Sequence, residues 1–204
     1  MPPLQNKVAL ITGAGRGTGQ AIALALGRAG ARIVVVDVNP DSVQRTADAI
    51  TQAGGRASVQ VADVANKMAV QTMLYAVIEQ GGRIDISVSA AQVTPSNTAL
   101  RMDEWEWNRT LDVNLKGAFL VAQTVARAMK ETGGGLILNI LRPAGNSPHA
   151  GVHAAREGLL GLTAALAAEW SGFGVRVEAV EASGDPEQTA LAVVQRCQVV
   201  IGNQ

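Results

Sequence analysis

The sequence predicts an α/β fold, in which a doubly wound parallel sheet lies between two layers of helices. Two observations lead to this prediction. Short runs rich in β-branched residues alternate along the chain with Ala- and Leu-rich segments of helical length. The strand-like runs are almost continuously apolar, which is typical of parallel strands buried on both faces. A chain of 204 residues, 48% of them hydrophobic, is also long enough to bury one substantial core.

The elements follow one another in a regular order. The predicted strands are KVALITG (7–13), ARIVVVDV (31–38), RASVQVADV (56–64), IDISVS (84–89), GGLILNIL (134–141) and VRVEAVEA (175–182). Helices are expected between them, at about residues 19–30, 41–53, 67–80, 103–130 and 151–170, and the end of the chain is expected to add one short helix and a final strand, CQVVI (197–201). This order predicts a Rossmann-like, three-layer α/β/α single domain with right-handed crossovers and a ligand crevice at the carboxyl ends of the strands.

Composition excludes several classes of partner and of site. Seventeen basic and seventeen acidic side chains balance without a basic run, and only 3% of residues are aromatic, so nucleic acid is not an expected partner. The lone Cys197 excludes an internal disulfide or a cysteine-based zinc cluster, and we expect it to be a small buried hydrophobe, with no metal site. Neither a signal peptide nor a run of about 18 apolar residues is present, which predicts a soluble, cytoplasmic protein without a membrane partner.

A glycine-rich turn follows the first predicted strand. Gly13, Gly15, Gly17 and Gly19 stand between this strand and the first helix. Glycines let the backbone approach a pyrophosphate closely, and the helix that follows offers unpaired amides and the positive end of its dipole. The turn therefore predicts an anion-binding site.

An acidic residue, Asp37, ends the second predicted strand, where its carboxylate can accept hydrogen bonds from an adenosine ribose. A phosphate on that ribose would be repelled, so we expect NAD rather than NADP, although Arg16 could favour the phosphorylated cofactor. The alternative is that the glycines only pack the helix on the sheet and that Asp37 caps a turn.

The spacing Thr12-Gly13-x-x-x-Gly17-x-Gly19 resembles the classical short-chain dehydrogenase/reductase family, and the resemblance extends over most of the chain. Asp63 and Val64 match the family position that holds the adenine amino group, SAAQ (89–92) replaces the family's Asn-Asn-Ala-Gly, and Trp107 and Asn114 match its fourth helix. The resemblance implies one dinucleotide-binding domain over residues 1–204. It implies cofactor contacts at Gly13, Arg16, Gly17, Thr18, Gly19, Asp37, Asp63, Val64, Ala90, Ala91 and Arg156.

The family's catalytic tetrad of Asn, Ser, Tyr and Lys is only partly matched. Asn114 is retained as the one candidate catalytic residue, whereas Arg142 stands at the Ser position, Val152 at Tyr and Arg156 at Lys. A guanidinium has no hydroxyl, and valine cannot transfer a proton. Arg156 could still hold a ribose hydroxyl or the cofactor's phosphates. The resemblance therefore implies a divergent member in which cofactor binding outlasts catalysis.

Histidines offer an alternative acid or base. Histidine is a common acid or base in catalysis, and His153 lies in the right helical turn. One residue along a helix rotates a side chain by about 100°, however, so His153 does not replace Val152 directly. Ser147 with His149 or His153 could resemble an activated nucleophile, yet no third, orienting acid is evident. The loop around Ser147 is about three residues shorter than the family's usual one.

The carboxyl end departs from the family pattern as well. Family members carry Pro-Gly and then a helical lid after the sixth strand. Here Ala182-Ser183 leads almost directly into the final helix, so the lid after residue 184 is expected to be missing. A small substrate would then be poorly shielded from water.

Three functions remain open at this stage. The first is an NAD(H)-binding pseudoenzyme that acts through cofactor binding or subunit association. The helices at 103–130 and 152–170 correspond to the family's dimer helices, so we expect a homodimer, a homotetramer or a complex with an active paralogue. The second is an oxidoreductase with a rearranged site, in which Arg142 and Arg156 clamp a carboxylate or phosphate beside Asn114, with His153 as a further member. The third is a structural remnant whose nucleotide site is filled by Gln92 or another side chain.

Overall fold

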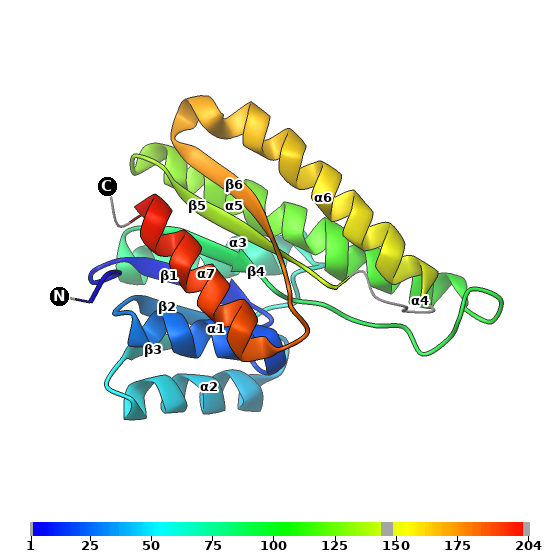
Figure 1. Cartoon of the computed structure of the whole chain (residues 1–204), viewed down its shortest axis with the longest axis horizontal. Coiled ribbons are helices and arrows are strands. Elements are labelled where there is room, and N and C mark those ends of the chain that lie inside the picture. Colours follow the sequence, from blue (N-terminus) through cyan, green and yellow to red (C-terminus); the bar gives the residue numbers. More distant parts are fainter. Residues whose placement is uncertain (1, 144–148, 202–204) are drawn as a thin grey trace.

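A single parallel sheet of six strands forms the centre of the molecule (Figure 1), in a computed structural model that describes residues 2–143 and 149–201. The strands lie in the order β3-β2-β1-β4-β5-β6. Their bounds are β1 (Val8–Thr12), β2 (Arg32–Asp37), β3 (Arg56–Val61), β4 (Ile86–Ser89), β5 (Gly135–Leu141) and β6 (Val175–Glu181). The chain runs outward from β1 to β3, returns past β1 to β4, and continues to β6. The predicted doubly wound α/β fold is therefore confirmed.

Helices cover both faces of this sheet (Figure 1). On one face lie α1 (Gly17–Arg28), α2 (Pro40–Gln52) and α7 (Pro186–Ile201), and on the other lie α3 (Lys67–Gly81), α5 (Ala118–Glu131) and α6 (Ala150–Trp170). Successive strand residues point to opposite faces, so that Ile11 packs under the first group of helices and Leu10 under the second. The near-continuous apolar strands thus supply two cores, one on each side.

The end of the chain differs from the sequence-based expectation. Residues 197–201 were predicted as a strand because CQVVI is rich in β-branched residues, but they form the last turns of α7. Ala190, Val193, Cys197 and Val200 are buried at helical spacing, and α7 packs beside α1. A short apolar run is ambiguous between strand and helix, and here packing against α1 decides for the helix. Burial raises the pKa of the Cys197 thiol to about 12.

The long helix expected at 103–130 is present with an internal change of pitch. It consists of α4 (Glu104–Leu111), the π-helical segment η1 (Asp112–Gly117) and α5. Asp103 caps its start by accepting a hydrogen bond from the Glu106 amide at 2.7 Å. Gly117 ends η1 where a Cβ atom would lie 2.7 Å from the Val64 side chain, so glycine is needed for this close approach. Wider π turns often occur at functional sites, and Asn114 lies within this one.

No helix within the described ranges combines the length and apolar character needed to cross a bilayer. The connection from β6 to α7 is short and consists of residues 182–185. At the carboxyl ends of the strands, the loop after β4 is extended in Figure 1 and leads to α4. This end of the sheet holds the site described next.

Candidate functional site

A cleft of about 380 Å³ lies at the carboxyl ends of the strands, where the strand order reverses between β1 and β4. Sheets of this topology bind ligands at such a switch point. The cleft is lined by Gly13, Arg16, Gly17, Thr18, Gly19, Val36, Asp37, Val38, Ala62, Asp63, Val64, Ala90, Ala91, Gln92, Val93, Arg109, Val113 and Arg142. The fold therefore brings together all the residues that were expected at the cofactor, with the exception of Arg156.

The β1–α1 turn approaches the loop after β4 very closely. Gly13 has a φ of 68°, and a Cβ atom at this position would lie 2.6 Å from the Ala91 Cα atom. A Cβ atom on Gly19 would lie 2.2 Å from the carbonyl oxygen of Gly13. No side chain caps the N-terminus of α1, and its first turn holds no acidic residue. This helix end therefore presents amides and positive dipole potential to the cleft, a combination that fits an anionic group such as a pyrophosphate.

The Asp37 carboxylate braces this turn from the end of β2. One of its oxygens accepts a hydrogen bond from the Gly15 amide at 3.1 Å, and the other accepts one from the Asn39 amide at 3.3 Å. A carboxylate has about four acceptor positions, so both oxygens can still accept hydrogen bonds from a ligand hydroxyl. Asp37 can therefore cap the turn and bind a ribose hydroxyl at the same time.

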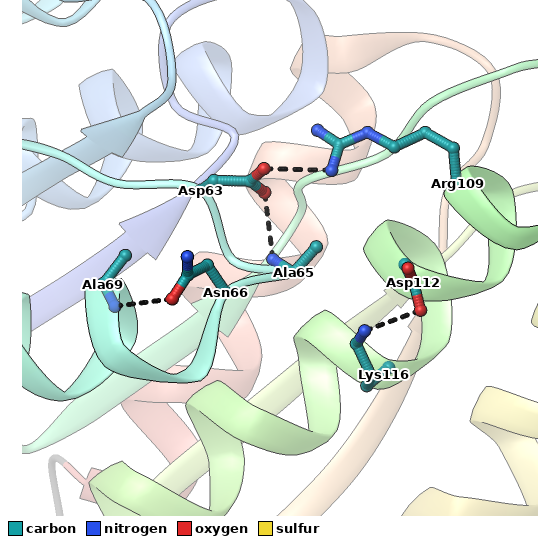
Figure 2. A network of polar contacts seen from close by, with 7 residues as sticks. All are labelled: Asp63, Ala65, Asn66, Ala69, Arg109, Asp112 and Lys116. Atoms are coloured by element: carbon teal, nitrogen blue, oxygen red, sulfur yellow. Dashed lines mark hydrogen bonds and ion pairs between the residues drawn. The ribbon is translucent and has the colours of Figure 1, made fainter. Parts of the chain in front are cut away.

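Asp63 lies at the rim of the cleft after β3 and is held by two donors (Figure 2). Its carboxylate accepts a hydrogen bond from the Ala65 amide at 3.0 Å and pairs with Arg109 Nη1 at 2.9 Å. Sequence reasoning missed Arg109, because 46 residues separate the two partners and only the packing of α4 brings them together. Figure 2 also shows Asn66 capping α3 through the Ala69 amide, which fixes the segment that carries Asp63.

Asn114, the retained member of the expected tetrad, uses its amide group to hold the backbone. Its Oδ1 atom accepts a hydrogen bond from the Val93 amide at 2.7 Å, and its Nδ2 atom donates to the Val93 carbonyl at 2.9 Å. The side chain is buried and lies outside the lining of the cleft. It faces instead a recess of about 10 Å³, which it shares with Val152 and Arg156. That volume is at the lower limit for a single water molecule.

Arg142 reaches the cleft from the end of β5. Its Nε atom donates a hydrogen bond to Gln92 Oε1 at 2.9 Å, and its Nη1 atom donates to the Thr94 hydroxyl. Gln92 is itself fixed, because its Nε2 atom donates to the Ile140 carbonyl at 2.7 Å. Burial lowers the pKa of the Arg142 guanidinium by desolvating its charge. Arg142, at the position where the family resemblance implies Ser, is thus an oriented cation. Its hydrogen bond to Gln92 forms because β4 and β5 are neighbouring strands.

Arg156 does not reach the cleft in which the sequence placed it. Its Nε atom donates to the Arg142 carbonyl at 2.9 Å, Nη2 pairs with Glu181 at 2.7 Å, and Nη1 pairs with Glu157. These bonds tie α6 to the ends of β5 and β6. The guanidinium is held by contacts within the protein, because Glu181 lies at the end of β6 within its reach. The contact with a cofactor that the family resemblance implies stays a prediction. Val152, one turn earlier in α6, is buried.

The histidines lie outside the cleft lining. His149 precedes α6, with its Nδ1 atom 3.2 Å from the Asn97 carbonyl oxygen, and His153 lies partly exposed in the first turn of α6. Ser147 lies outside the described residues. The only tyrosine of the chain, Tyr75, is exposed on α3.

Among the described residues that line the cleft, the titratable ones are Arg16, Asp37, Asp63, Arg109 and Arg142. Asp37 ends β2 and Asp63 follows β3, so both acids lie away from the β4–β5 end of the lining. The one charged group of the described lining at that end is the Arg142 guanidinium, and no His, Lys, Tyr or Cys is among the lining residues. No group of three His, Cys, Asp or Glu side chains within the described part of the chain is suited to hold a metal ion. The arrangement is suited to binding a polar, partly anionic ligand.

Comparisons with known proteins agree with this geometry. A model of the short chain dehydrogenase family matches residues 7–190. The chain is 39% identical over 180 residues to a D-threitol dehydrogenase of Mycolicibacterium smegmatis, a match that covers 87% of this chain and 69% of that protein. It is 36% identical over 198 residues to the short chain dehydrogenase/reductase astE of Aspergillus oryzae, covering 94% of this chain and 76% of that protein.

Solved structures show the same similarity. A metagenomic short-chain oxidoreductase in complex with NADP superposes with a TM-score of 0.91 at 31% identity, over 96% of this chain and 92% of that one.

The contacts of Arg156 lead to a prediction about stability. Arg156→Ala should lower the free energy of unfolding by about 1 to 3 kcal/mol, because it removes charge-assisted bonds that join α6 to two strand ends. Arg156→Lys should lose less. Denaturation with urea measures both, with Arg45→Ala, an exposed change on α2, as the control. If Arg156→Ala instead weakened dinucleotide binding at unchanged stability, Arg156 would contact the cofactor as the sequence suggested.

Proposed function

We propose that this chain, which belongs to the short-chain dehydrogenase family, binds a nicotinamide dinucleotide in the cleft without carrying out the family's usual hydride transfer. A bound nicotinamide would supply the site for hydride exchange. The chain itself would supply the cradle: the glycine turn and the α1 N-terminus for the pyrophosphate, Asp37 for the adenosine ribose, and Asp63 with Val64 for the adenine. Ala90 and Ala91 would border the cofactor on the β4 side.

The absence of a proton-transferring group at the β4–β5 end of the described cleft lining carries the second half of this proposal. Reduction of a carbonyl requires a group that can give up a proton, and a guanidinium holds its protons at any physiological pH. Asn114 is engaged on both sides by the Val93 backbone. Val152 and Arg156 offer neither a phenol nor an ammonium where the family resemblance implies them.

The short connection between β6 and α7 supports the same proposal. Only residues 182–185 join these elements, so we infer that the chain lacks the family's lid at this point. A substrate beside the nicotinamide would remain in contact with water, which weakens every electrostatic interaction that could favour catalysis.

A second candidate is an oxidoreductase with a rearranged site. Relatives of this chain have names such as D-threitol dehydrogenase, and Arg142 lies where a guanidinium could polarise a bound carbonyl. This function would need a proton donor from outside the described lining, such as the substrate itself. We therefore favour the binding function and let one assay decide between the two.

The surface along η1, α5 and α6 suggests association with a second subunit. An apolar groove of about 390 Å³ is lined by residues that include Leu115, Phe119 and Leu162. A Cβ atom on Gly158 would lie 2.9 Å from the Leu115 side chain, so glycine lets α6 approach η1 closely beneath it. We infer that this groove packs against another copy, as a homodimer or homotetramer, or against an active paralogue.

Calorimetry and absorbance at 340 nm together test the proposed function. NADH should bind with a Kd of about 0.1 mM or tighter, while screens with aldehydes, ketones and alcohols show no change in cofactor absorbance above background. Activity that disappears in Arg142→Gln would support the second candidate. No binding at millimolar NADH would identify the chain as a structural remnant and reject both.

The Asp37 carboxylate leads to a prediction about cofactor choice. NADPH should bind roughly tenfold more weakly than NADH, a difference of about 1.4 kcal/mol, because its ribose phosphate would face a carboxylate. Asp37→Asn should reduce this ratio, since it removes the charge and keeps an acceptor for the Gly15 amide. Asp48→Asn, on the exposed face of α2, is the control for net charge. Tighter native binding of NADPH would indicate that Arg16 outweighs Asp37.

The apolar groove leads to a prediction about assembly. Light scattering after size-exclusion chromatography should show a dimer or tetramer for the native chain, and Phe119→Lys should shift it to monomer by placing a charge in the interface. Tyr75→Lys, which changes an exposed aromatic residue on α3, should leave the assembly intact. A monomeric native chain, or an unchanged assembly in Phe119→Lys, would contradict the use of this groove.

A further inference from the structure

Arg142 has no acidic partner in the part of the chain that the structure describes, although its side chain is half-buried. The neighbouring arginines differ in this respect. Arg109 pairs with Asp63, and Arg156 pairs with Glu157 and Glu181. Arg142 donates hydrogen bonds to Gln92 and Thr94, which are both neutral. These acceptors orient the guanidinium and do not compensate its charge. A half-buried charge has lost part of its hydration, and an anionic ligand would supply the counterion that the described residues do not.

Arg142 follows β5, whereas the turn suited to a pyrophosphate follows β1. β5 lies two strands from β1, which corresponds to roughly 10 Å at the usual spacing of neighbouring strands. The guanidinium is held toward the loop after β4 by Gln92, which in turn is anchored to the β5 backbone at Ile140. This chain of hydrogen bonds gives the cation a defined place on the β4–β5 side of the cleft.

We propose that Arg142 binds the carboxylate of a small organic acid, at the β4–β5 end of the cleft beside the dinucleotide. The planar guanidinium matches a carboxylate in shape and in charge. A single positive charge flanked by two neutral groups suits a monoanion better than a phosphate dianion. The dinucleotide would occupy the rest of the cleft, which favours a small acid over a large one. This inference rests on the proposed function, because the dinucleotide forms one wall of the acid site.

Saturation-transfer NMR with two probes of equal shape tests the inference on protein saturated with NADH. Butyrate should bind at least tenfold more tightly than neutral butyramide, because only butyrate carries the carboxylate charge. In Arg142→Gln the two probes should bind equally. Arg142→Lys, which keeps the charge and loses the planar fork, should retain part of the preference. Arg45→Gln, the loss of an exposed arginine on α2, should retain all of it. Thermal melting confirms that each variant is folded.

Three results would overturn the inference. Native protein that prefers butyrate no more than butyramide would show that Arg142 does not bind carboxylates. Equal losses of NADH and butyrate affinity in Arg142→Gln would assign the guanidinium to the dinucleotide's own phosphates. Displacement of butyrate by an equal or lower concentration of inorganic phosphate would make the site a phosphate site.

Failure of the proposed function gives a different result. If NADH does not bind the native chain, that function is rejected, and the butyrate titration is then repeated without NADH. A preference for butyrate that is lost in Arg142→Gln would still support a carboxylate site at Arg142, and no preference would reject it.

Discussion

The close contact between the β1–α1 turn and the loop after β4 is the constraint on which the rest of the site depends. The strand order reverses at this point, so the chain leaves β1 and β4 toward opposite faces of the sheet, and the cleft opens beside the place where the two loops touch. Gly13 lies against the Ala91 backbone where a side chain would collide, and Gly19 lies against the Gly13 carbonyl for the same reason. Any larger residue would push α1 away from the sheet and turn its amides out of the cleft.

Polar side chains around the cleft are used mainly to fasten backbone segments. Asn114 holds the loop after β4, Gln92 links this loop to β5, and Arg156 links α6 to β5 and β6. Buried polar groups require partners, and for these three side chains the protein itself provides them. A site built in this way is rigid and leaves few groups available to act on a ligand, which is consistent with binding as its proposed role.

The charges of the cleft are separated along the sheet. Asp37 ends β2, and Asp63, paired with Arg109, follows β3. The uncapped α1 N-terminus with Arg16 follows β1, and Arg142 follows β5. A ligand that spans the cleft would therefore meet acceptors for sugar and base groups first, then a region for anionic groups, and finally a cation. This order matches the proposed dinucleotide with a small acid beside it.

Local patterns in the sequence were sufficient for the fold class and for the glycine turn and Asp37 at the cleft. Strand-like runs, a glycine turn and an acid at the end of β2 each depend on residues close together in the chain, and family resemblance added Asp63 and Ala91. The sequence could not settle residues 197–201, because a short apolar run suits a strand or a helix until α1 packs against it. It also missed the pairing of Arg109 with Asp63 and the pairing of Arg156 with Glu157 and Glu181. Only the tertiary structure decided these contacts, because a long charged side chain binds whichever partner the packing of distant elements brings within reach.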